Sequence, residues 1–318
     1  GNNHEGDFAL AKKMIRLASA SGANAVKFQA IVPERLVSSN QSDRIAQLRR
    51  FSLSPDQFKE LKQVAEDEKV IFLATPFDLQ SVNWLDELVP AWKISSGDNN
   101  FTPLLDRVAA TGKPVIISLG LGCHDNSATL LAYFNSAWRK HGKKESEIAL
   151  LHCVASYPTP DEEASLTLIR SLSVQGATPG YSDHTLGMKA PELAVAAGAR
   201  IIEKHFTTNN SYSDFRDHQL SANPKDFAEM VNAIRRVERM LHSSSKIQSC
   251  ESSNEIHFRR SLAAGKDLPE GVILRKEDLI WVRPGTGIPL GGELELIGKK
   301  TSQEIKYGEL LSRAMFSP

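Results

Sequence analysis

The chain has 318 residues, and its 38 Lys and Arg side chains are balanced by 38 Asp and Glu side chains, so the formal net charge is zero. This balance argues against general electrostatic binding to nucleic acid or to an anionic membrane, which requires an excess of positive charge. With 41% hydrophobic and 24% charged residues, the composition is that of a folded protein rather than a disordered one. No apolar run approaches the roughly 18–20 residues of a membrane span. The length suits one large domain with a small one, or two medium domains.

The cysteines and the chain start give two further expectations. Cys123, Cys153 and Cys250 are too few and too scattered for a disulfide framework, which favours a reducing, cytoplasmic location. The sequence opens at Gly1 with neither an initiator Met nor a signal peptide. It is therefore expected to begin partway through a structural unit.

Short, apolar, β-branched runs alternate with amphipathic helical stretches along residues 1–241. Runs of this kind, without strict polar alternation, are typical of strands buried on both faces of a parallel sheet. Seven strands are predicted, at residues 23–29, 70–74, 91–95, 114–118, 148–153, 178–181 and 200–205. The run 178–181 is the weakest prediction, because Pro179 and Gly180 are poor strand residues.

Helices are predicted between these strands. The apolar residues of 8–18 fall mostly on one helical face, and residues 226–241 form another amphipathic stretch. Ser54, followed by Pro55 and then by Gln57, indicates a helix start with a capping box.

Repeated βα units imply parallel strands joined by right-handed crossovers. A (β/α)8 TIM barrel has eight strands, whereas seven are counted and the chain begins with a loop and a helix. We therefore expect a TIM barrel whose first strand is missing from this chain and lies upstream of Gly1. The alternative is an open, doubly wound sheet.

The composition changes after the predicted barrel. Residues 242–256 are polar and Ser-rich and are expected to be a linker. Residues 257–318 then predict a small, loop-rich domain, with strand-like pieces at 260–264 and 271–274 and a turn at 283–287.

Polar side chains gather where the predicted strands end, which is the active-site face of a barrel. Lys27 and Lys93 lie in apolar strands, and a buried lysine requires an anion, either a ligand or a catalytic carboxylate. With nearby hydroxyls and glycines they would form a cradle for phosphate or carboxylate. Each serine taken alone is more readily explained as a helix N-cap. The polar residues at these ends include Gln29, Thr75, Ser95, Ser96, Asp98, Ser118, His152, Tyr157, Ser182, Glu203 and Lys204.

His184 and His205 end adjacent predicted strands, 21 residues or about one βα unit apart. Two imidazoles placed there could share one partly hydrated divalent ion such as Mn²⁺, although spacing alone leaves a structural role equally open. Cys153 beside His152 could be a thiol nucleophile, but a buried strand-end cysteine is the favoured interpretation.

The ordered motifs of the chain resemble the sialic acid synthase family. Residues 257–318 are similar to that family's C-terminal antifreeze-like SAF domain, which resembles type III antifreeze protein. The matching segments are Asn2-Asn3-His4-Glu5-Gly6, Val26-Lys27-Phe28-Gln29, Ala74-Thr75-Pro76-Phe77-Asp78, Lys93-Ile94-Ser95-Ser96-Gly97-Asp98, His152-Cys153, Tyr157-Pro158-Thr159-Pro160, Ser182-Asp183-His184-Thr185, Glu203-Lys204-His205-Phe206-Thr207, Arg259-Arg260-Ser261-Leu262 and Arg283-Pro284-Gly285-Thr286-Gly287.

The resemblance implies a barrel followed by the SAF domain, in a domain-swapped homodimer where the small domain caps the partner's barrel. It implies condensation of phosphoenolpyruvate with N-acetylmannosamine or a related 2-acetamido sugar, giving a nine-carbon 2-keto acid and phosphate, with Mn²⁺ or with Mg²⁺ or Co²⁺. It further implies residue roles: metal binding by His184 and His205, catalysis by Asp98 and Tyr157, binding of phosphoenolpyruvate by Lys27, Thr75, Lys93, Ser96, Ser118 and Ser182, and sugar contacts by Gln29, Asp217 and, from the partner's cap, Arg283.

Three departures from the family pattern leave other functions open. The family's catalytic Glu precedes the segment that starts at Gly1, Leu119 replaces a usual Thr, and Ala155 replaces a usual Ser or Asn. One alternative is a barrel that binds sugar or phosphate without catalysis. Another is a synthase for a legionaminic- or pseudaminic-type acid, and a third uses a sugar phosphate such as arabinose 5-phosphate or erythrose 4-phosphate as acceptor.

Overall fold

The computed structural model describes residues 2–173, 176–215, 217–242 and 248–317. Contacts divide the chain into two compact units, Gly1–Leu241 and His242–Pro318. Part of the expected linker, residues 243–247, lies outside the described residues, and helix α12 (Glu255–Phe258) begins before the linker's expected end. No helix in the described ranges is long and apolar enough to cross a membrane.

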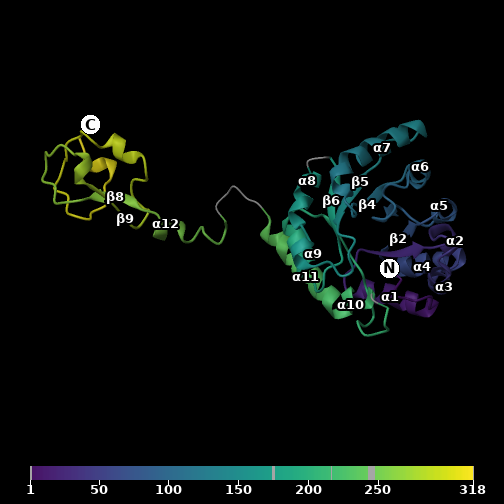
Figure 1. The fold of residues 1–318 in the computed structure, drawn as a ribbon. Coiled ribbons are helices and arrows are strands. Elements are labelled where there is room, and N and C mark those ends of the chain that lie inside the picture. The colour runs from purple at the N-terminus through teal and green to yellow at the C-terminus, as the bar shows by residue number, and fades with distance from the viewer. Residues whose placement is uncertain (1, 174–175, 216, 243–247, 318) are drawn as a thin grey trace. The chain divides into compact units, whose positions relative to one another are not determined.

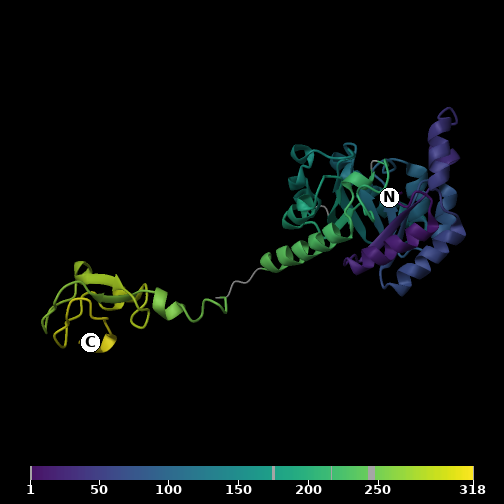
Figure 2. The same ribbon diagram turned by 90° about the horizontal axis from the view of Figure 1, so that it is seen from below.

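The first unit is built on a curled, parallel sheet of seven strands surrounded by helices (Figure 1; Figure 2). Each strand pairs with the next along the chain, which confirms the predicted parallel βα organisation. A doubly wound sheet would reverse its strand order at a switch point, so this topology excludes that alternative. The strands are β1 (Ala25–Ala30), β2 (Ile71–Pro76), β3 (Trp92–Ile94), β4 (Val115–Ser118), β5 (Ile148–Cys153), β6 (Thr178–Asp183) and β7 (Ile201–Lys204).

Strand β6 forms despite its proline and glycine, and it is two residues longer than predicted. Gly180 is required by close packing, because a Cβ at this position would lie 2.2 Å from Leu151 Cδ2 and 2.7 Å from the Ile201 carbonyl oxygen. Glycine therefore permits the close approach of β5 and β7 to this strand.

The helices begin where local capping groups fix them. The Ser54 hydroxyl accepts from the Gln57 N–H and the Gln57 side chain accepts from the Ser54 N–H, which confirms the predicted capping box of α4. Helix α11 begins earlier than predicted because the Asn223 side chain accepts from the Asp226 N–H. The helices of this unit are α1 (Phe8–Ala20), α2 (Pro33–Leu36), α3 (Ser42–Phe51), α4 (Pro55–Asp67), α5 (Leu79–Leu85), α6 (Thr102–Ala109), α7 (Ser127–Lys140), α8 (Ile169–Ser173), α9 (Lys189–Ala196), α10 (Asp217–Leu220) and α11 (Pro224–Met240), with 3₁₀ turns η1 (Cys123–Asn126), η2 (Asp161–Glu163) and η3 (Leu166–Leu168).

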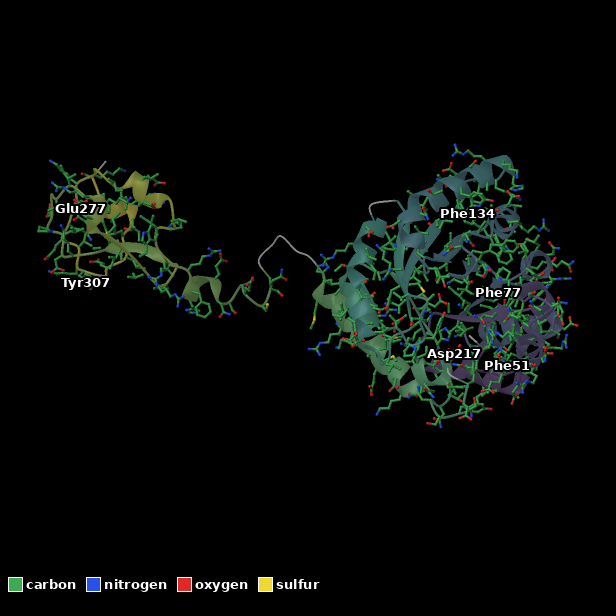
Figure 3. All side chains as sticks on the ribbon, in the orientation of Figure 1. Phe51, Phe77, Phe134, Asp217, Glu277 and Tyr307 are labelled. Atoms are coloured by element: carbon green, nitrogen blue, oxygen red, sulfur yellow. The ribbon has the colours of Figure 1, made fainter. Side chains whose placement is uncertain are left out.

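The main hydrophobic core fills the space between the sheet and its outer helices. Phe58, Trp92, Phe134 and Trp138 are fully buried there, and Figure 3 labels Phe134. This core fixes the strands, so the side chains at the strands' carboxyl ends lie on a rigid base.

The second unit has its own core around a two-stranded antiparallel sheet of β8 (Ser261–Ala264) and β9 (Leu279–Val282). Strand β8 matches the predicted piece at 260–264. The strand predicted at 271–274 is wrong, because Ile273 makes only an isolated bridge to Lys300 and the Val272 N–H donates to the Thr301 hydroxyl. Three 3₁₀ turns complete this unit, η4 (Lys276–Asp278), η5 (Gly292–Glu295) and η6 (Arg313–Met315).

Candidate active site

Two lysines converge on one carboxylate inside the sheet. Lys27 of β1 donates to the carboxylate of Glu203 on β7. Lys93 of β3 lies 3.4 Å from the same carboxylate and donates to the Ser118 hydroxyl at 2.7 Å. Two cations therefore face one anion, and the side chain of Lys93 is only 4% exposed.

The charges of this cluster follow from burial and from the neighbouring groups. Burial lowers the pKa of Lys93 to about 8, so the ammonium group keeps its proton at neutral pH. Burial alone would raise the pKa of Glu203, but the positive charges of Lys27 and Lys93 outweigh it and hold that pKa well below its usual range. The cluster thus carries one surplus positive charge, which suits an anionic ligand.

Buried hydroxyl groups stand near the carboxyl ends of β2, β4 and β6. Thr75, Ser118 and Ser182 are buried, and the Thr75 hydroxyl has no hydrogen-bond partner among the described residues. A buried hydroxyl without a partner is costly, so it is a natural contact for a ligand. Ser96 packs beside Gly120, where an added Cβ would lie 2.8 Å from Ser96 Cβ.

The two departures at Leu119 and Ala155 are accommodated differently. Leu119 is buried in the main hydrophobic core, where a hydroxyl would need a partner. Ala155 Cβ lies 3.4 Å from the Cβ position at Gly120, so a small side chain fits that packing.

The two predicted imidazoles lie together at the ends of β6 and β7. The ring centroids of His184 and His205 are 5.4 Å apart. The Nδ1 atom of His184 lies 2.8 Å from the Val154 carbonyl oxygen, so it donates and leaves the lone pair on Nε2. The Tyr157 ring lies 4.1 Å from the His184 ring and 5.9 Å from that of His205.

His205 has an unsatisfied nitrogen that faces a carboxylate. Its buried Nδ1 makes no hydrogen bond among the described residues and lies 3.6 Å from Asp217 Oδ2. Burial lowers the pKa of both His184 and His205, so both rings are neutral at neutral pH and can offer lone pairs. His184 Nε2 and His205 Nδ1 are suitable ligands for a divalent metal ion. The described ranges contain no group of three or more His, Cys, Asp and Glu side chains arranged to hold one.

Asp98 and Cys153 differ in what they can contribute. Burial raises the pKa of Asp98, although the Ser95 hydroxyl, which donates to its carboxylate, and the charge of Lys93 act in the opposite direction. Burial raises the pKa of the Cys153 thiol to about 11, which keeps the thiol protonated and disfavours the nucleophile hypothesis.

The site has two compartments that meet at His205. One cavity, of about 190 Å³, is lined mostly by apolar side chains, many of them from α1, β1 and β7, and its lining also includes Lys27, Lys93 and Glu203. A larger cavity, of about 1110 Å³, is lined by Gln29 among others, and His205 lines both. The larger lining also includes Tyr157 and three residues that Figure 3 labels, namely Phe51, Phe77 and Asp217.

Successive side chains of β7 point to opposite faces of the sheet, so one face carries site residues and the other carries a structural ion pair. Glu203 belongs to the lysine cluster, whereas Lys204 points the other way and lies 2.6 Å from Asp183, with both side chains fully buried. Lys204 also donates to the Thr185 carbonyl oxygen, which braces the loop that carries His184. The two-residue spacing of Glu203 and His205 is the sequence signal that could have assigned Glu203 to the site.

Arg283 belongs to the second unit. Its guanidinium donates to the Phe258 carbonyl oxygen at 3.0 Å and lies 5.3 Å from the centre of the Phe258 ring. The predicted role of Arg283 at a partner's barrel therefore stays a prediction.

Comparison with known proteins gives the same assignment over the whole chain. The NeuB family model matches residues 14–246, and the SAF domain model matches residues 259–317. An uncharacterised protein of Methanocaldococcus jannaschii is 41% identical over 295 residues, covering 91% of this chain and 84% of that protein. The N,N'-diacetyllegionaminic acid synthase of Campylobacter jejuni is 34% identical over 330 residues, covering 98% of this chain and 96% of the relative.

A solved structure supports the fold. The N-acetylneuraminic acid (sialic acid) synthetase of Leptospira borgpetersenii, in complex with citrate, matches with a TM-score of 0.72 and 35% identity, covering 80% of this chain and 87% of that chain. The two family models together match both units, so the chain belongs to the NeuB family and carries a SAF domain at its C-terminal end.

Proposed function

We propose that the protein condenses phosphoenolpyruvate with N-acetylmannosamine or a related 2-acetamido sugar. The products are a nine-carbon 2-keto acid and phosphate. The observation that carries the proposal is the convergence of Lys27 and Lys93 on Glu203, two residues before His205, which lines the large polar cavity. Relatives named as legionaminic acid and sialic acid synthases support this class of reaction.

Phosphoenolpyruvate is assigned to the lysine cluster of Lys27, Lys93 and Glu203. Lys27 and Lys93 supply the charge, while Thr75, Ser96, Ser118 and Ser182 supply hydroxyl donors for its phosphate and carboxylate. Lys93 already orients the Ser118 hydroxyl at 2.7 Å, so this part of the site is preorganised.

His184 and His205 would hold a divalent ion, with Mn²⁺ as the first candidate and Mg²⁺ or Co²⁺ as others. When bound, such an ion polarises the aldehyde oxygen of the open-chain sugar. The Val154 carbonyl oxygen fixes the His184 tautomer, and Tyr157 covers the ring pair.

The reaction forms one carbon–carbon bond and releases phosphate by hydrolysis. C3 of the enol attacks the aldehyde carbon, whose oxygen takes a proton, and water adds at C2. The resulting tetrahedral centre expels phosphate and becomes the keto group. We assign proton transfer to Asp98, whose pKa is raised by burial. Gln29, Tyr157 and Asp217 line the large cavity and would border the sugar.

The assay is phosphate release from phosphoenolpyruvate with Mn²⁺ and a panel of acceptors. The panel contains N-acetylmannosamine, 4-acetamido-6-deoxy relatives, arabinose 5-phosphate and erythrose 4-phosphate. Turnover with an acetamido sugar supports the proposal, and its absence with all of them, despite binding, favours the non-catalytic barrel. A 6-deoxy acceptor is the second candidate, because Ile31, Leu36 and Phe77 give the large cavity apolar wall for a methyl group.

We also propose a homodimer in which the SAF domain caps the partner's barrel and Arg283 reaches the acetamido group. The Arg283 side chain is exposed, and the hydrogen bond from its Nε to the Phe258 carbonyl oxygen orients the guanidinium, which supports this role. Sedimentation of the full chain should give twice the 35.0 kDa chain mass. An Arg283→Ala variant should raise the acceptor KM with little change for phosphoenolpyruvate.

A further inference from the structure

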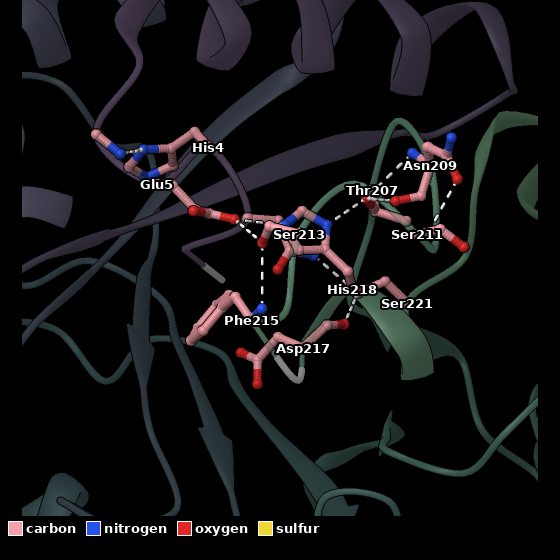
Figure 4. A network of polar contacts seen from close by, with 12 residues as sticks. His4, Glu5, Thr207, Asn209, Ser211, Ser213, Phe215, Asp217, His218 and Ser221 are labelled. Atoms are coloured by element: carbon pink, nitrogen blue, oxygen red, sulfur yellow. Dashed lines mark hydrogen bonds and ion pairs between the residues drawn. The ribbon is translucent and has the colours of Figure 1, made fainter. Parts of the chain in front are cut away.

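Glu5 connects the loop before α1 to the segment that follows β7 (Figure 4). Its Oε1 atom lies 2.9 Å from His218 Nε2 and accepts from the Ser213 hydroxyl. These partners are more than 200 residues away in the chain. A single carboxylate oxygen therefore holds two distant segments together at the wall of the large cavity.

The groups that hold Glu5 are themselves fixed. The Phe215 N–H donates to the Ser213 hydroxyl at 3.1 Å, and His218 Nδ1 lies 2.6 Å from the Thr207 hydroxyl. The His218 side chain is 1% exposed. Glu5 Oε1 is thus oriented by two partners that have little freedom to move.

The backbone at Glu5 is held in an uncommon conformation. Glu5 has φ 47° and Gly6 has φ 86°, both in the left-handed region. A Cβ at Gly6 would lie 1.9 Å from the Arg50 carbonyl oxygen, so α3 packs directly on this turn. A non-glycine residue kept in such a conformation by surrounding packing is typical of functional positions.

The second carboxylate oxygen of Glu5 is available to a ligand. Among the residues that the structure describes, Oε2 has no hydrogen-bond or ion-pair partner, whereas Oε1 has two. The side chain is 27% exposed and lines the large cavity together with Gln29 and Asp217. An ionised carboxylate only accepts hydrogen bonds, so its natural ligands are hydroxyl and amide N–H groups.

We propose that Glu5 is a specificity-determining residue for the acceptor, with Oε2 accepting from a hydroxyl or acetamido N–H of the sugar. This inference rests on the proposed function and names a contact within the same site. Anchoring of Oε1 by Ser213 and His218 keeps the carboxylate from turning away, so the contact is preorganised.

The test measures binding by calorimetry on the full chain with Mn²⁺. The ligands are N-acetylmannosamine, its singly deoxygenated and deacetylated analogues, and phosphoenolpyruvate. Glu5→Gln is expected to weaken N-acetylmannosamine binding about ten- to hundred-fold, as for a hydrogen bond to a charged group. Phosphoenolpyruvate affinity should change less than about twofold, because its site lies at Lys27 and Lys93.

The analogue series separates a direct contact from a structural role. One analogue lacks the sugar group from which Oε2 accepts, and wild type should bind this analogue weakly. The Glu5→Gln variant should bind the same analogue with the affinity of wild type, because the contact is already absent. Ser213→Ala keeps the carboxylate and should retain the wild-type analogue pattern. Glu5→Asp, which keeps the charge but shortens the side chain, should give an intermediate loss with the same pattern, and it serves if Glu5→Gln does not fold.

The outcomes are distinguishable. If wild type binds phosphoenolpyruvate but no acceptor sugar, the proposed function fails and the Glu5 contact fails with it. If wild type binds and turns over the acceptor while Glu5→Gln binds it equally well, only the role of Glu5 is overturned. Parallel losses for every analogue and for phosphoenolpyruvate would also overturn it, since they indicate a structural effect alone.

Discussion

Replacing Glu203 by glutamine tests the charge balance of the lysine cluster. The variant keeps the size and the hydrogen-bonding oxygen of the side chain but removes the negative charge that Lys27 and Lys93 share. At the 3.4 Å separation from Lys93, the lost attraction is about 5 kcal/mol for an effective dielectric constant of 20. The remaining hydrogen bonds and the 22% exposure of the Glu203 side chain reduce this, so we expect a loss of about 3 kcal/mol in unfolding free energy.

An anion should replace the missing carboxylate. Inorganic phosphate or phosphoenolpyruvate is therefore expected to stabilise Glu203→Gln more than wild type, because neither ligand has to share the two ammonium groups with a fixed negative charge. Since the pKa of Lys93 is already lowered to about 8, loss of Glu203 should lower it further, and the bound anion should restore the proton.

The assay is urea unfolding at pH 7 with and without phosphate. Tryptophan fluorescence reports mainly on the first unit, which contains Trp84, Trp92 and Trp138. The matched control is Glu60→Gln, which removes the same charge from an exposed pair with Lys12 and should change stability by less than about 0.5 kcal/mol. If Glu203→Gln matches this control and phosphate does not stabilise it further, the account of the cluster is wrong.

Three other predictions concern separate parts of the first unit. His205→Ala should lose Mn²⁺ binding in calorimetry, whereas His141→Ala, which replaces a half-buried histidine that lies beside Asp106, should retain it. Equal binding by both variants would contradict the metal assignment. For phosphoenolpyruvate, kcat/KM should fall as pH rises through about 8, because Lys93 in the free enzyme then loses its charge, and a flat profile to pH 9.5 would contradict this. Gly6→Ala should lower the thermal midpoint far more than Gly187→Ala does. Both glycines have positive φ, but a Cβ at Gly6 would lie 1.9 Å from a backbone oxygen, whereas nothing lies within 4 Å of a Cβ at Gly187. Similar shifts of the thermal midpoint would refute the packing argument.

The strands and their order were predictable because buried parallel strands leave a clear sequence pattern. Short apolar runs ending in polar residues located all seven strands, and regular βα spacing gave the sequential order. The strand predicted at 271–274 failed because the small unit is stabilised by isolated bridges and turns, and a short apolar run does not distinguish these from a ladder. Strand β9 was missed for the same reason.

The site residues that were predictable from the sequence are charged residues that lie in apolar strands. Lysines in apolar strands require an anion, and the structure brings Lys27 and Lys93 to one carboxylate. The role of Glu203 was not assigned, because a glutamate near a strand end has many ordinary explanations. Glu5 could not be found from spacing at all, since its partners, His218 and Ser213, are brought to it only by the tertiary fold.

The alternation of β7 limits how this enzyme family can vary. A single-residue insertion before Glu203 would shift the strand register, bring Lys204 among the cations and turn Glu203 and His205 outward. The buried ion pair of Lys204 with Asp183 would be lost at the same time. This ion pair on one face of β7 therefore fixes the register that places Glu203 and His205 on the other face. Changes in acceptor preference are therefore expected to evolve in the loops that surround the large cavity, where length can change without such a shift, while the length of this strand stays invariant.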